Sequence, residues 1–285
     1  MCDKNFDREY HKKMLALSNS SIKFLKKDVL EVGGCEFPEL IQKYNPKSWT
    51  SIDISDNRLN LLKNSTIPDF YNFRKMNIEN STFSDNSFDY IYSLDCFEHI
   101  SDLNSALGEM YRVLKPNGFL VAKFGPIWSS PIGHHTWFEH NNKLYHFNDN
   151  LFNDWYHLAF SKDEFIRTLR NKYPEEILNK IAYSVYESYD INRMVDSDYI
   201  KAIKKNNFIP ILILRRKLYK KKEKNIVEKV VGRYPQIQNL NTTTFLIILS
   251  KKHISAFDFF KIYRGVFSFL IKDKLLTYIK LPWFN

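Results

Sequence analysis

The stretch DVLEVGGCEF, residues 28–37, is an apolar run that ends in an acid and two glycines. This composition predicts a buried strand that turns sharply into a helix, because glycine lets the backbone turn tightly and approach a ligand closely. The next apolar run, WTSIDIS at 49–55, places Asp53 twenty-two residues after Glu31, at the end of a second strand. An acid there can accept hydrogen bonds from ribose hydroxyls. The combination predicts a nucleotide-cofactor pocket, whereas the glycine turn alone is equally typical of an ordinary strand-to-helix connection.

The rest of the first 125 residues alternates short β-rich apolar runs with helical stretches, which is typical of strand–helix–strand units that build a parallel sheet. The predicted strands are 28–32, 49–53, 70–75, 88–93, 119–124, 208–214 and 244–249. The predicted helices are 103–114, which Lys115-Pro116-Asn117-Gly118 would end, 161–182 and 196–206. These features predict an α/β fold with a seven-stranded, mostly parallel sheet and helices on both faces.

Composition divides the chain into three parts. We expect an N-terminal helical segment at 1–27, a principal domain at 28–252 and a separate tail at 253–285. From residue 125 the sequence is rich in Gly, Pro, Trp, His and Asn, which is typical of a pocket wall and not of a long regular element. We therefore expect residues 125–207 to be an insertion that forms an acceptor pocket.

The net charge of +10 is concentrated in the second half of the chain. Residues 1–150 carry 17 Lys/Arg against 19 Asp/Glu, whereas residues 151–285 carry 25 against 13. The densest run, RRKLYKKKEK at 215–224, could bind nucleic acid, an anionic membrane surface or a phosphorylated substrate. A solvated basic helix or hairpin is the alternative interpretation.

The three cysteines, Cys2, Cys35 and Cys96, are widely spaced and form no paired metal or redox motif. This favours a reducing compartment. The first residues, MCDKNFDREYHKK, lack an apolar core of signal-peptide length, and no uncharged apolar run is long enough to span a bilayer. We therefore expect a cytoplasmic protein that is neither secreted nor membrane-spanning.

The tail is predicted to form an amphipathic helix. Its apolar face contains Phe259, Phe260, Tyr263, Val266, Phe267, Leu270 and Ile271, and its polar face contains Asp258, Lys261, Gly265, Ser268 and Lys272. The helix could dock on its own domain or on a second copy of the chain. It could instead lie in an anionic membrane interface at the inner membrane face, because aromatic and cationic residues suit that surface.

The block SFDYIYSLDCFEHISDLNSALGEMYRVLKPNGFLVAKFG at 87–125, together with the glycine turn and Asp53, resembles class I S-adenosylmethionine-dependent methyltransferases, in particular the type 11-like domain. Phe88-Asp89, Glu98-His99 and Leu114–Gly118 stand where the family has its "FD" strand, its "EH" loop end and its "LKPGG"-like turn. The likeness covers about residues 28–125 well and reaches the last strands more loosely. It implies a Rossmann-like fold and S-adenosylmethionine as the cofactor.

The resemblance also implies which residues contact the cofactor. They are Glu31, Gly33, Gly34, Cys35, Asp53, Ile54, Asn77, Ile78, Ser93 and His99. Glu31 and Gly33 would face the methionine portion, and Asp53 the ribose. The chain departs from the family pattern at Cys35 and Phe37, which replace glycines, and at Asn77, where the family usually has an acid at the adenine. The carbonyl oxygen of an asparagine can still accept a hydrogen bond from the adenine amino group.

Candidate catalytic residues follow the fourth and fifth strands. The segment GPIWSSPIGHHTW at 125–137 would overhang the crevice at the carboxyl ends of the strands, where open α/β sheets bind ligands. His134 and His135 are candidate general bases, with His135 favoured, because histidine titrates near neutrality. Either could instead only shape the loop. Asp95 could orient an acceptor hydroxyl or satisfy loop amides.

Trp128 and Trp137 bracket the two histidines and could stack on a sugar ring, or form loop core. The five histidines between residues 134 and 157 match no zinc signature, so we predict no metal site.

The sequence thus predicts an S-adenosylmethionine-dependent methyltransferase that O-methylates a small or carbohydrate acceptor. The 125–137 segment is also loosely similar to methyltransferases of bacterial surface-polysaccharide pathways. Two alternatives are an RNA methyltransferase that uses residues 215–224, although no RNA-binding module accompanies that run, and a non-catalytic cofactor-binding scaffold.

Overall fold

The computed structural model describes residues 4–34, 36–56 and 67–272, so the predictions for Cys35 and for the end of the tail lie outside the described residues. The helices are α1 (Lys4–Ile22), α2 (Pro38–Gln42), α3 (Leu103–Val113), α4 (Tyr156–Ala159), α5 (Lys162–Leu169), α6 (Glu175–Tyr186), α7 (Asp196–Lys205), α8 (Lys224–Arg233) and α9 (Ala256–Lys272), with short 3-10 turns η2 (Ile78–Asn80) and η3 (Phe97–His99). The strands are β1 (Asp28–Val32), β2 (Ser48–Asp53), β3 (Tyr71–Lys75), β4 (Phe88–Leu94), β5 (Leu114–Phe124), β6 (Trp137–His140), β7 (Lys143–His146), β8 (Ile209–Lys217) and β9 (Thr242–Ser250).

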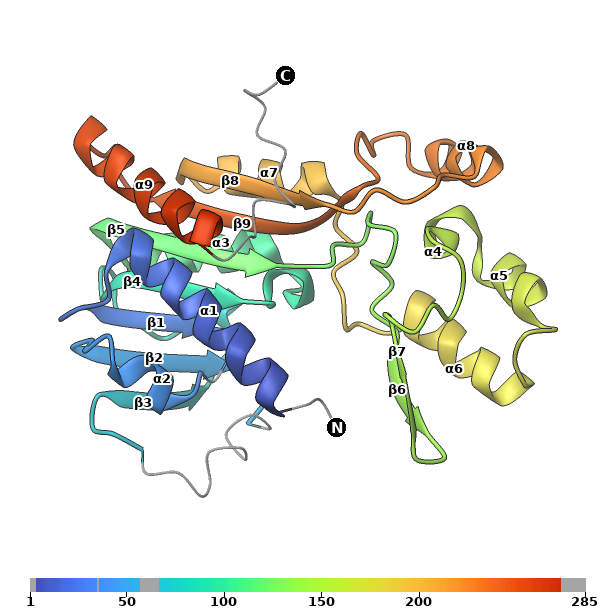
Figure 1. The fold of residues 1–285 in the computed structure, drawn as a ribbon, viewed down its shortest axis with the longest axis horizontal. Coiled ribbons are helices and arrows are strands. Elements are labelled where there is room, and N and C mark those ends of the chain that lie inside the picture. The colour runs from blue at the N-terminus through green and yellow to red at the C-terminus, as the bar shows by residue number, and fades with distance from the viewer. Residues whose placement is uncertain (1–3, 35, 57–66, 273–285) are drawn as a thin grey trace.

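Seven strands form one sheet in the order β3-β2-β1-β4-β5-β9-β8 (Figure 1). The pairs β1–β2, β1–β4, β2–β3 and β4–β5 are parallel, whereas β9 is antiparallel to β5 and to β8. The predicted seven-stranded, mostly parallel sheet is confirmed. Strand order reverses beside β1, so the carboxyl ends of β1 and β4 open a crevice of the kind in which α/β sheets bind ligands.

Helices cover both faces of the sheet, as predicted. Side chains alternate between faces along β1: Leu30 packs with α3 and α7, whereas Val29 packs with α1, α2 and α9. Both residues are fully buried. Strands that are buried on two faces are near-continuously apolar, which explains why these runs could be located from sequence.

Two elements differ from the prediction. β5 begins at Leu114, the last residue of the predicted helix, and continues through the predicted stop, because Leu114 already pairs with Phe88 before an irregular register at Lys115–Gly118. The predicted helix 161–182 is two helices, α5 and α6, and Pro174 stands before the first residue of α6. Proline has no N–H and disfavours helical conformation in the residue before it, so the helix restarts there.

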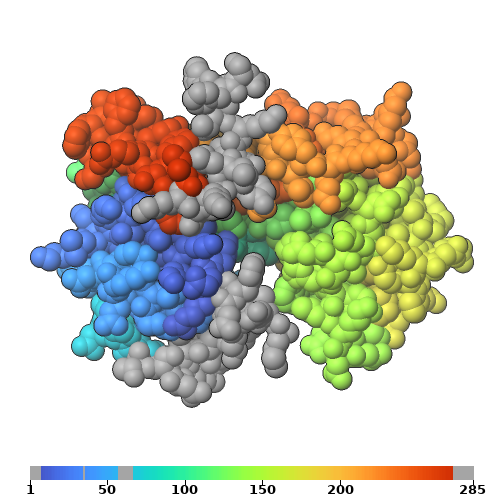
Figure 2. All heavy atoms as spheres, in the orientation of Figure 1, coloured from blue at the N-terminus to red at the C-terminus, as the bar shows by residue number. Residues whose placement is uncertain are grey.

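A second apolar cluster lies beside the sheet and not on it. α4, α5, α6 and α8 pack there around buried residues such as Trp155, Phe165, Ile181 and Val230. The β6–β7 hairpin projects from this helical lobe (Figure 1). α7, which comes before residue 207, packs on the sheet through Tyr199, whereas α8, which comes after it, packs in the lobe. Residue 207 therefore does not separate the two apolar clusters. Figure 2 shows the surface hollowed between the sheet domain and the lobe.

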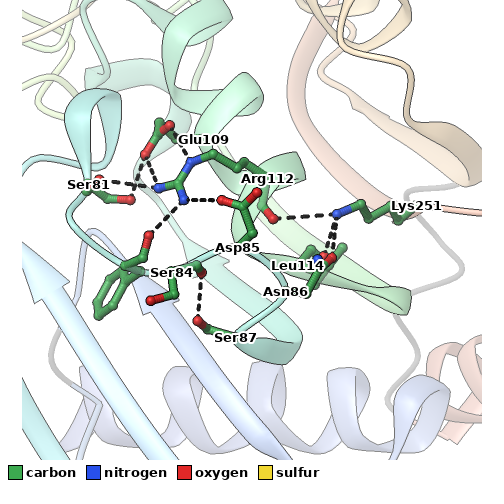
Figure 3. A network of polar contacts seen from close by, with 10 residues as sticks. Ser81, Ser84, Asp85, Asn86, Ser87, Glu109, Arg112, Leu114 and Lys251 are labelled. Carbon is green, nitrogen blue, oxygen red and sulfur yellow. Dashed lines mark hydrogen bonds and ion pairs between the residues drawn. The ribbon is translucent and has the colours of Figure 1, made fainter.

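A network around Arg112 fixes the loop between η2 and β4 (Figure 3). The Arg112 guanidinium donates to Glu109, to the Asp85 carboxylate at 2.7 Å and to the Phe83 carbonyl at 2.7 Å. Ser81 donates to Glu109 at 2.8 Å. The network attaches the segment that follows η2 to α3, and it thereby supports the wall of the crevice that η2 forms.

Candidate functional site

A cavity of about 350 Å³ lies at the carboxyl ends of β1, β2, β3 and β4. Six of the residues predicted to bind the cofactor line it: Gly33, Asp53, Ile54, Asn77, Ile78 and His99. Asp95 and Cys96 line the same cavity. The topology alone brings these residues together, because they lie at the ends of four parallel strands, β1 to β4, and the carboxyl ends of those strands meet at one edge.

Gly33 is required by the geometry of the first turn. Its φ of +76° lies in the left-handed region, and a Cβ atom there would be 2.0 Å from the Sγ atom of Cys96. The backbone of β1 therefore passes directly against the end of β4, and any side chain at this position would displace Cys96. This leaves bare backbone on the cavity wall.

Glu31 is buried behind the cavity wall, and both oxygens of its carboxylate accept hydrogen bonds. Its carboxylate accepts hydrogen bonds from the Glu36 backbone N–H at 2.9 Å, from the Trp49 indole at 2.8 Å and from the Ser51 hydroxyl. A Cβ at Gly34 would be 2.4 Å from the Glu31 Oε1 atom. Burial, and then the nearby Glu36, raise the pKa of Glu31 to about 7. Glu31 thus shapes the turn through hydrogen bonds to it.

Asp53 and Asn77 end the next two strands. Asp53 Oδ1 accepts the Ser55 backbone N–H at 2.8 Å, and within the described residues its other carboxylate oxygen accepts no hydrogen bond. Asn77 Oδ1 accepts the Glu79 N–H at 2.9 Å and so caps η2. A carbonyl oxygen has two lone pairs, so Asn77 can still accept one more hydrogen bond.

Asp95 is held from two sides. Its carboxylate accepts a hydrogen bond from the Tyr10 hydroxyl of α1 at 2.7 Å and pairs with the Lys123 ammonium of β5 at 2.7 Å. Lys123 also donates to the Tyr10 oxygen. Burial and Asp95 raise the pKa of Tyr10 well above its ordinary value, so its hydroxyl remains a donor. Asp95 itself has a φ of +48°, a backbone conformation that non-glycine residues rarely adopt and that is enriched at functional sites.

His99 is the imidazole that lines the cavity, and His135 lies behind it. Nδ1 of His99 contacts the Asp190 carbonyl, and the His99 and His135 rings meet edge to face with centroids 5.1 Å apart. His135 Nε2 is 2.5 Å from the Pro126 carbonyl, so in the tautomer that donates this bond Nδ1 is an acceptor. Burial, and then His99, lower the pKa of His135 to about 3, so His135 is neutral near pH 7.

The other predicted site residues lie away from the cavity. His134 is buried against Phe152, with Nδ1 2.7 Å from the Thr136 hydroxyl, and burial lowers its pKa well below 6.5. Trp128 is buried in the helical lobe beside His157. The Ser93 hydroxyl donates to the Val32 carbonyl at 2.9 Å inside the sheet.

Trp137 lies in a separate groove of about 590 Å³ on the helical lobe. Its ring is 52% exposed, and Tyr183 of α6 in the same groove is 57% exposed. Glu176, Asn179 and Glu187 supply carboxylate and amide groups to the lining. Asp190 also lines the groove, and its carbonyl contacts His99 of the cavity. The groove and the cavity are therefore neighbours, and this contact lies between them.

Sequence reasoning missed Tyr10 and Lys123. Lys123 is a cation at the end of an otherwise apolar strand, VAKF, and that pattern is a usable signal for a residue at a binding edge. Tyr10 stands 85 residues before its partner Asp95, on a helix that no motif connects to the crevice. Only the packing of α1 reveals it.

The described residues contain neither a cluster of metal ligands nor a membrane-spanning helix. Within residues 4–34, 36–56 and 67–272, no group of three or more His, Cys, Asp or Glu side chains is arranged to hold a metal ion. Across the same ranges, no helix combines the length and apolar character needed to cross a membrane.

Comparison with known proteins gives one family and short matches to its relatives. Residues 30–122 match the family described as "Methyltransferase domain". Phosphoethanolamine N-methyltransferase 2 of Caenorhabditis elegans is 46% identical over 44 residues, which are 15% of this chain and 10% of that protein. The ubiquinone/menaquinone biosynthesis C-methyltransferase UbiE of Rickettsia prowazekii (strain Madrid E) is 40% identical over 81 residues, which are 26% of this chain and 32% of UbiE. The matched segments thus span at most about a third of these relatives' own length.

The fold is similar to the crystal structure of an S-adenosylmethionine-dependent methyltransferase from Mesorhizobium loti. The TM-score is 0.51 at 11% sequence identity, over 84% of this chain and 97% of that one. A likeness at this identity concerns the fold, whereas the family match concerns the sequence of the crevice itself, from Leu30 to Ala122. Residues 30–122 are therefore similar to a methyltransferase domain, and the fold of the described chain is similar to that of an S-adenosylmethionine-dependent methyltransferase.

Proposed function

We propose that the protein is an S-adenosylmethionine-dependent methyltransferase that methylates a hydroxyl group of a sugar or surface-glycan-related small acceptor. The observation that carries the proposal is the cavity in which Gly33, Asp53 and Asn77 share a wall with Asp95 and His99. When bound, the cofactor supplies an electrophilic methyl group on a sulfonium. The protein then has to align the acceptor, exclude water and remove a proton.

The cofactor would be held mainly by strand-end groups. The Asp53 oxygen that no described group contacts suits the ribose hydroxyls, and the remaining lone pair of Asn77 suits the adenine amino group. Ile54 and Ile78 line the same cavity and offer apolar contact to the base. The bare backbone at Gly33 would allow close approach of the methionine portion.

We assign the role of general base to His99, in place of His134 or His135. Its ring lines the cavity, and with Nδ1 directed at the Asp190 carbonyl its Nε2 can accept a proton from the acceptor hydroxyl. His135 packs edge to face against it and would hold the ring orientation. Asp95, paired with Lys123, would accept a hydrogen bond from the acceptor and orient it.

The groove beside the cavity supports a carbohydrate acceptor. Exposed aromatic rings such as Trp137 and Tyr183 can stack on the apolar face of a sugar ring. Carboxylate and amide groups of Glu176, Asn179 and Glu187 can bind its hydroxyls. Asp190 of the groove contacts His99 of the cavity, so a glycan bound in the groove would lie next to the site of the methyl donor.

The two relatives named above transfer methyl groups to carbon and to nitrogen, by their names, so the oxygen acceptor rests on the imidazole and the groove. No observation favours nucleic acid. In the basic run, Arg215 pairs with Asp196 at 3.1 Å, Lys220 with Asp154 at 3.8 Å and Lys224 with Glu228 at 3.9 Å. These acids offset part of the charge that a phosphate backbone would need.

The test is to incubate the purified protein with methyl-labelled S-adenosylmethionine and cell extract, and to identify the labelled product by mass spectrometry. We expect the label on a sugar oxygen, and none with the matched control Asp53→Ala. Label on a nitrogen or carbon atom would refute the acceptor assignment. Absence of S-adenosylhomocysteine binding in calorimetry would refute the enzyme function itself.

A further inference from the structure

The outward side of α9 carries large apolar residues although the helix is docked. Phe257, Phe260, Arg264, Ser268 and Ile271 recur at spacings that place them on one helical face, together with Lys261. Phe257 is 76% exposed, Phe260 70% and Ile271 61%. We call these six residues the outer face of α9. No acid belongs to it.

The opposite side of the same helix is already used. Ile262, Val266 and Leu270 are buried in the cluster that α1 shares with the sheet. At Gly265 the two helices touch through their backbones, because a Cβ there would be 2.2 Å from the Ser20 carbonyl oxygen, and Ser20 Oγ donates to the Gly265 carbonyl at 3.1 Å. Docking on the domain thus buries one side of α9 and leaves the apolar residues of the outer face exposed to solvent. Figure 2 shows α9 on the outside of the molecule, beside the N-terminal segment.

A cationic hollow of about 440 Å³ adjoins the first turns of α9. Lys23, Lys252 and Lys261 line it with His253, and its one acid, Asp258, accepts a hydrogen bond from Ser255 at 2.7 Å. None of these three lysines forms an ion pair within the part of the chain that the structure describes. The hollow therefore presents a net positive charge beside exposed phenylalanines.

The α1–β1 loop adds to the same surface. Leu25, two residues after Lys23, is 56% exposed and is followed by the exposed Lys26. Two acids of the strands, Asp28 of β1 and Asp89 of β4, both pair with Lys115, at 3.0 and 2.9 Å. Apolar residues and cations thus alternate across the hollow, the loop and the outer face of α9.

We propose that this surface docks the protein on an anionic phospholipid bilayer. Exposed aromatic and aliphatic side chains that enter the headgroup boundary gain burial of apolar area, and nearby cations gain attraction to acidic lipids of about 1 kcal/mol each. Uncompensated lysines disfavour a second copy of the same face as the occupant, since like charges would oppose each other. The proposal does not depend on the methyltransferase activity.

The docked orientation has a direct geometric consequence. The hollow is lined by Tyr90, near the amino end of β4, and by Phe119, its register partner in β5, whereas the cofactor cavity lies at the carboxyl ends of the parallel strands. The cavity would therefore open away from the bilayer.

The experiment is flotation of the full chain with phosphatidylcholine vesicles that either contain or lack phosphatidylglycerol. We expect flotation only with phosphatidylglycerol. The Phe257→Ser/Phe260→Ser variant should bind at least about tenfold more weakly, because its apolar anchor is lost. Lys23→Gln/Lys252→Gln should weaken binding about thirtyfold, from about fivefold for each cation.

Matched controls come from outside this surface. Tyr189→Ser removes an aromatic residue that is 91% exposed, and Lys201→Gln removes an exposed cation of α7. Both should float like the wild type. Equal flotation of all variants, flotation without phosphatidylglycerol, or no flotation of the wild type would each overturn the proposal. So would a concentration-dependent dimer that Phe257→Ser/Phe260→Ser abolishes in the absence of lipid binding.

Discussion

Replacing Gly33 by alanine tests the turn on which the site is built. Alanine in the left-handed region costs about 1–2 kcal/mol. Its Cβ would also be 2.0 Å from Cys96 Sγ and 2.5 Å from Cys96 Cβ, so Cys96 has to move. Overpacking of this kind costs about 1–3 kcal/mol. We therefore expect Gly33→Ala to lower the free energy of unfolding by about 2–5 kcal/mol, measured by urea denaturation.

The two contributions can be separated with Cys96→Gly, which removes both clashing atoms. The double variant Gly33→Ala/Cys96→Gly should then be more stable than the sum of the single effects by about 1–3 kcal/mol, the overpacking part alone. Additivity within about 0.5 kcal/mol would refute the contact between the β1 turn and the end of β4. Loss of less than about 1 kcal/mol in Gly33→Ala would refute the left-handed conformation. Cys96→Ala is the matched control, because it keeps the nearer carbon and should restore less stability.

Three further predictions concern the cavity and the lobe. Asp53→Asn keeps an acceptor for the Ser55 N–H but loses the carboxylate charge, so S-adenosylhomocysteine should bind about 2 kcal/mol, or roughly thirtyfold, more weakly in calorimetry; a change below twofold would contradict the ribose assignment. His99→Ala should lower kcat about a hundredfold or more, with a smaller loss for His135→Ala, and unchanged turnover on the identified acceptor would remove the base. Burial lowers the pKa of His157 to about 4. Between about pH 6.5 and pH 4 the unfolded chain therefore binds a proton that the folded chain does not bind. The free energy of unfolding should fall by about 1.4 kcal/mol for each pH unit of acidification in this range. His157→Gln should flatten this pH dependence in urea denaturation, and an unchanged slope would contradict the buried neutral imidazole.

The strands could be predicted from sequence because the information is local. A strand such as β1, buried on two faces, is an apolar run with a glycine turn after it, and neither feature depends on distant residues. The positions of Gly33, Asp53 and Asn77 on one cavity wall follow from the parallel order of the strands, which the alternation of strands and helices predicts.

The side-chain positions in the loop after β5 could not be predicted from the sequence in this way. Trp128 and Trp137 stand in one segment of uniform composition, yet the first is buried in the lobe and the second is exposed in the groove. Which of them reaches solvent depends on how α4 and α6 pack, and that packing leaves no periodic signal within the loop. The same holds for His134 and His135, whose rings point into different surroundings although they are adjacent in the chain.

Helix α1 contacts both ends of the domain. Near its end, Ser20 touches the backbone of α9, and near its beginning, Tyr10 donates to Asp95 in the cofactor cavity. At 1.5 Å per residue its 19 residues extend roughly 28 Å, so one helix connects the α9 contact with the cavity. A ligand that strengthens the Asp95 contact would thereby stabilise the position of α1, and any partner that prefers the docked α9 would favour that same position. Thermodynamic linkage then requires the two effects to be reciprocal. Ligand binding in the cavity and partner binding at α9 would then each strengthen the other, because both favour the same position of α1.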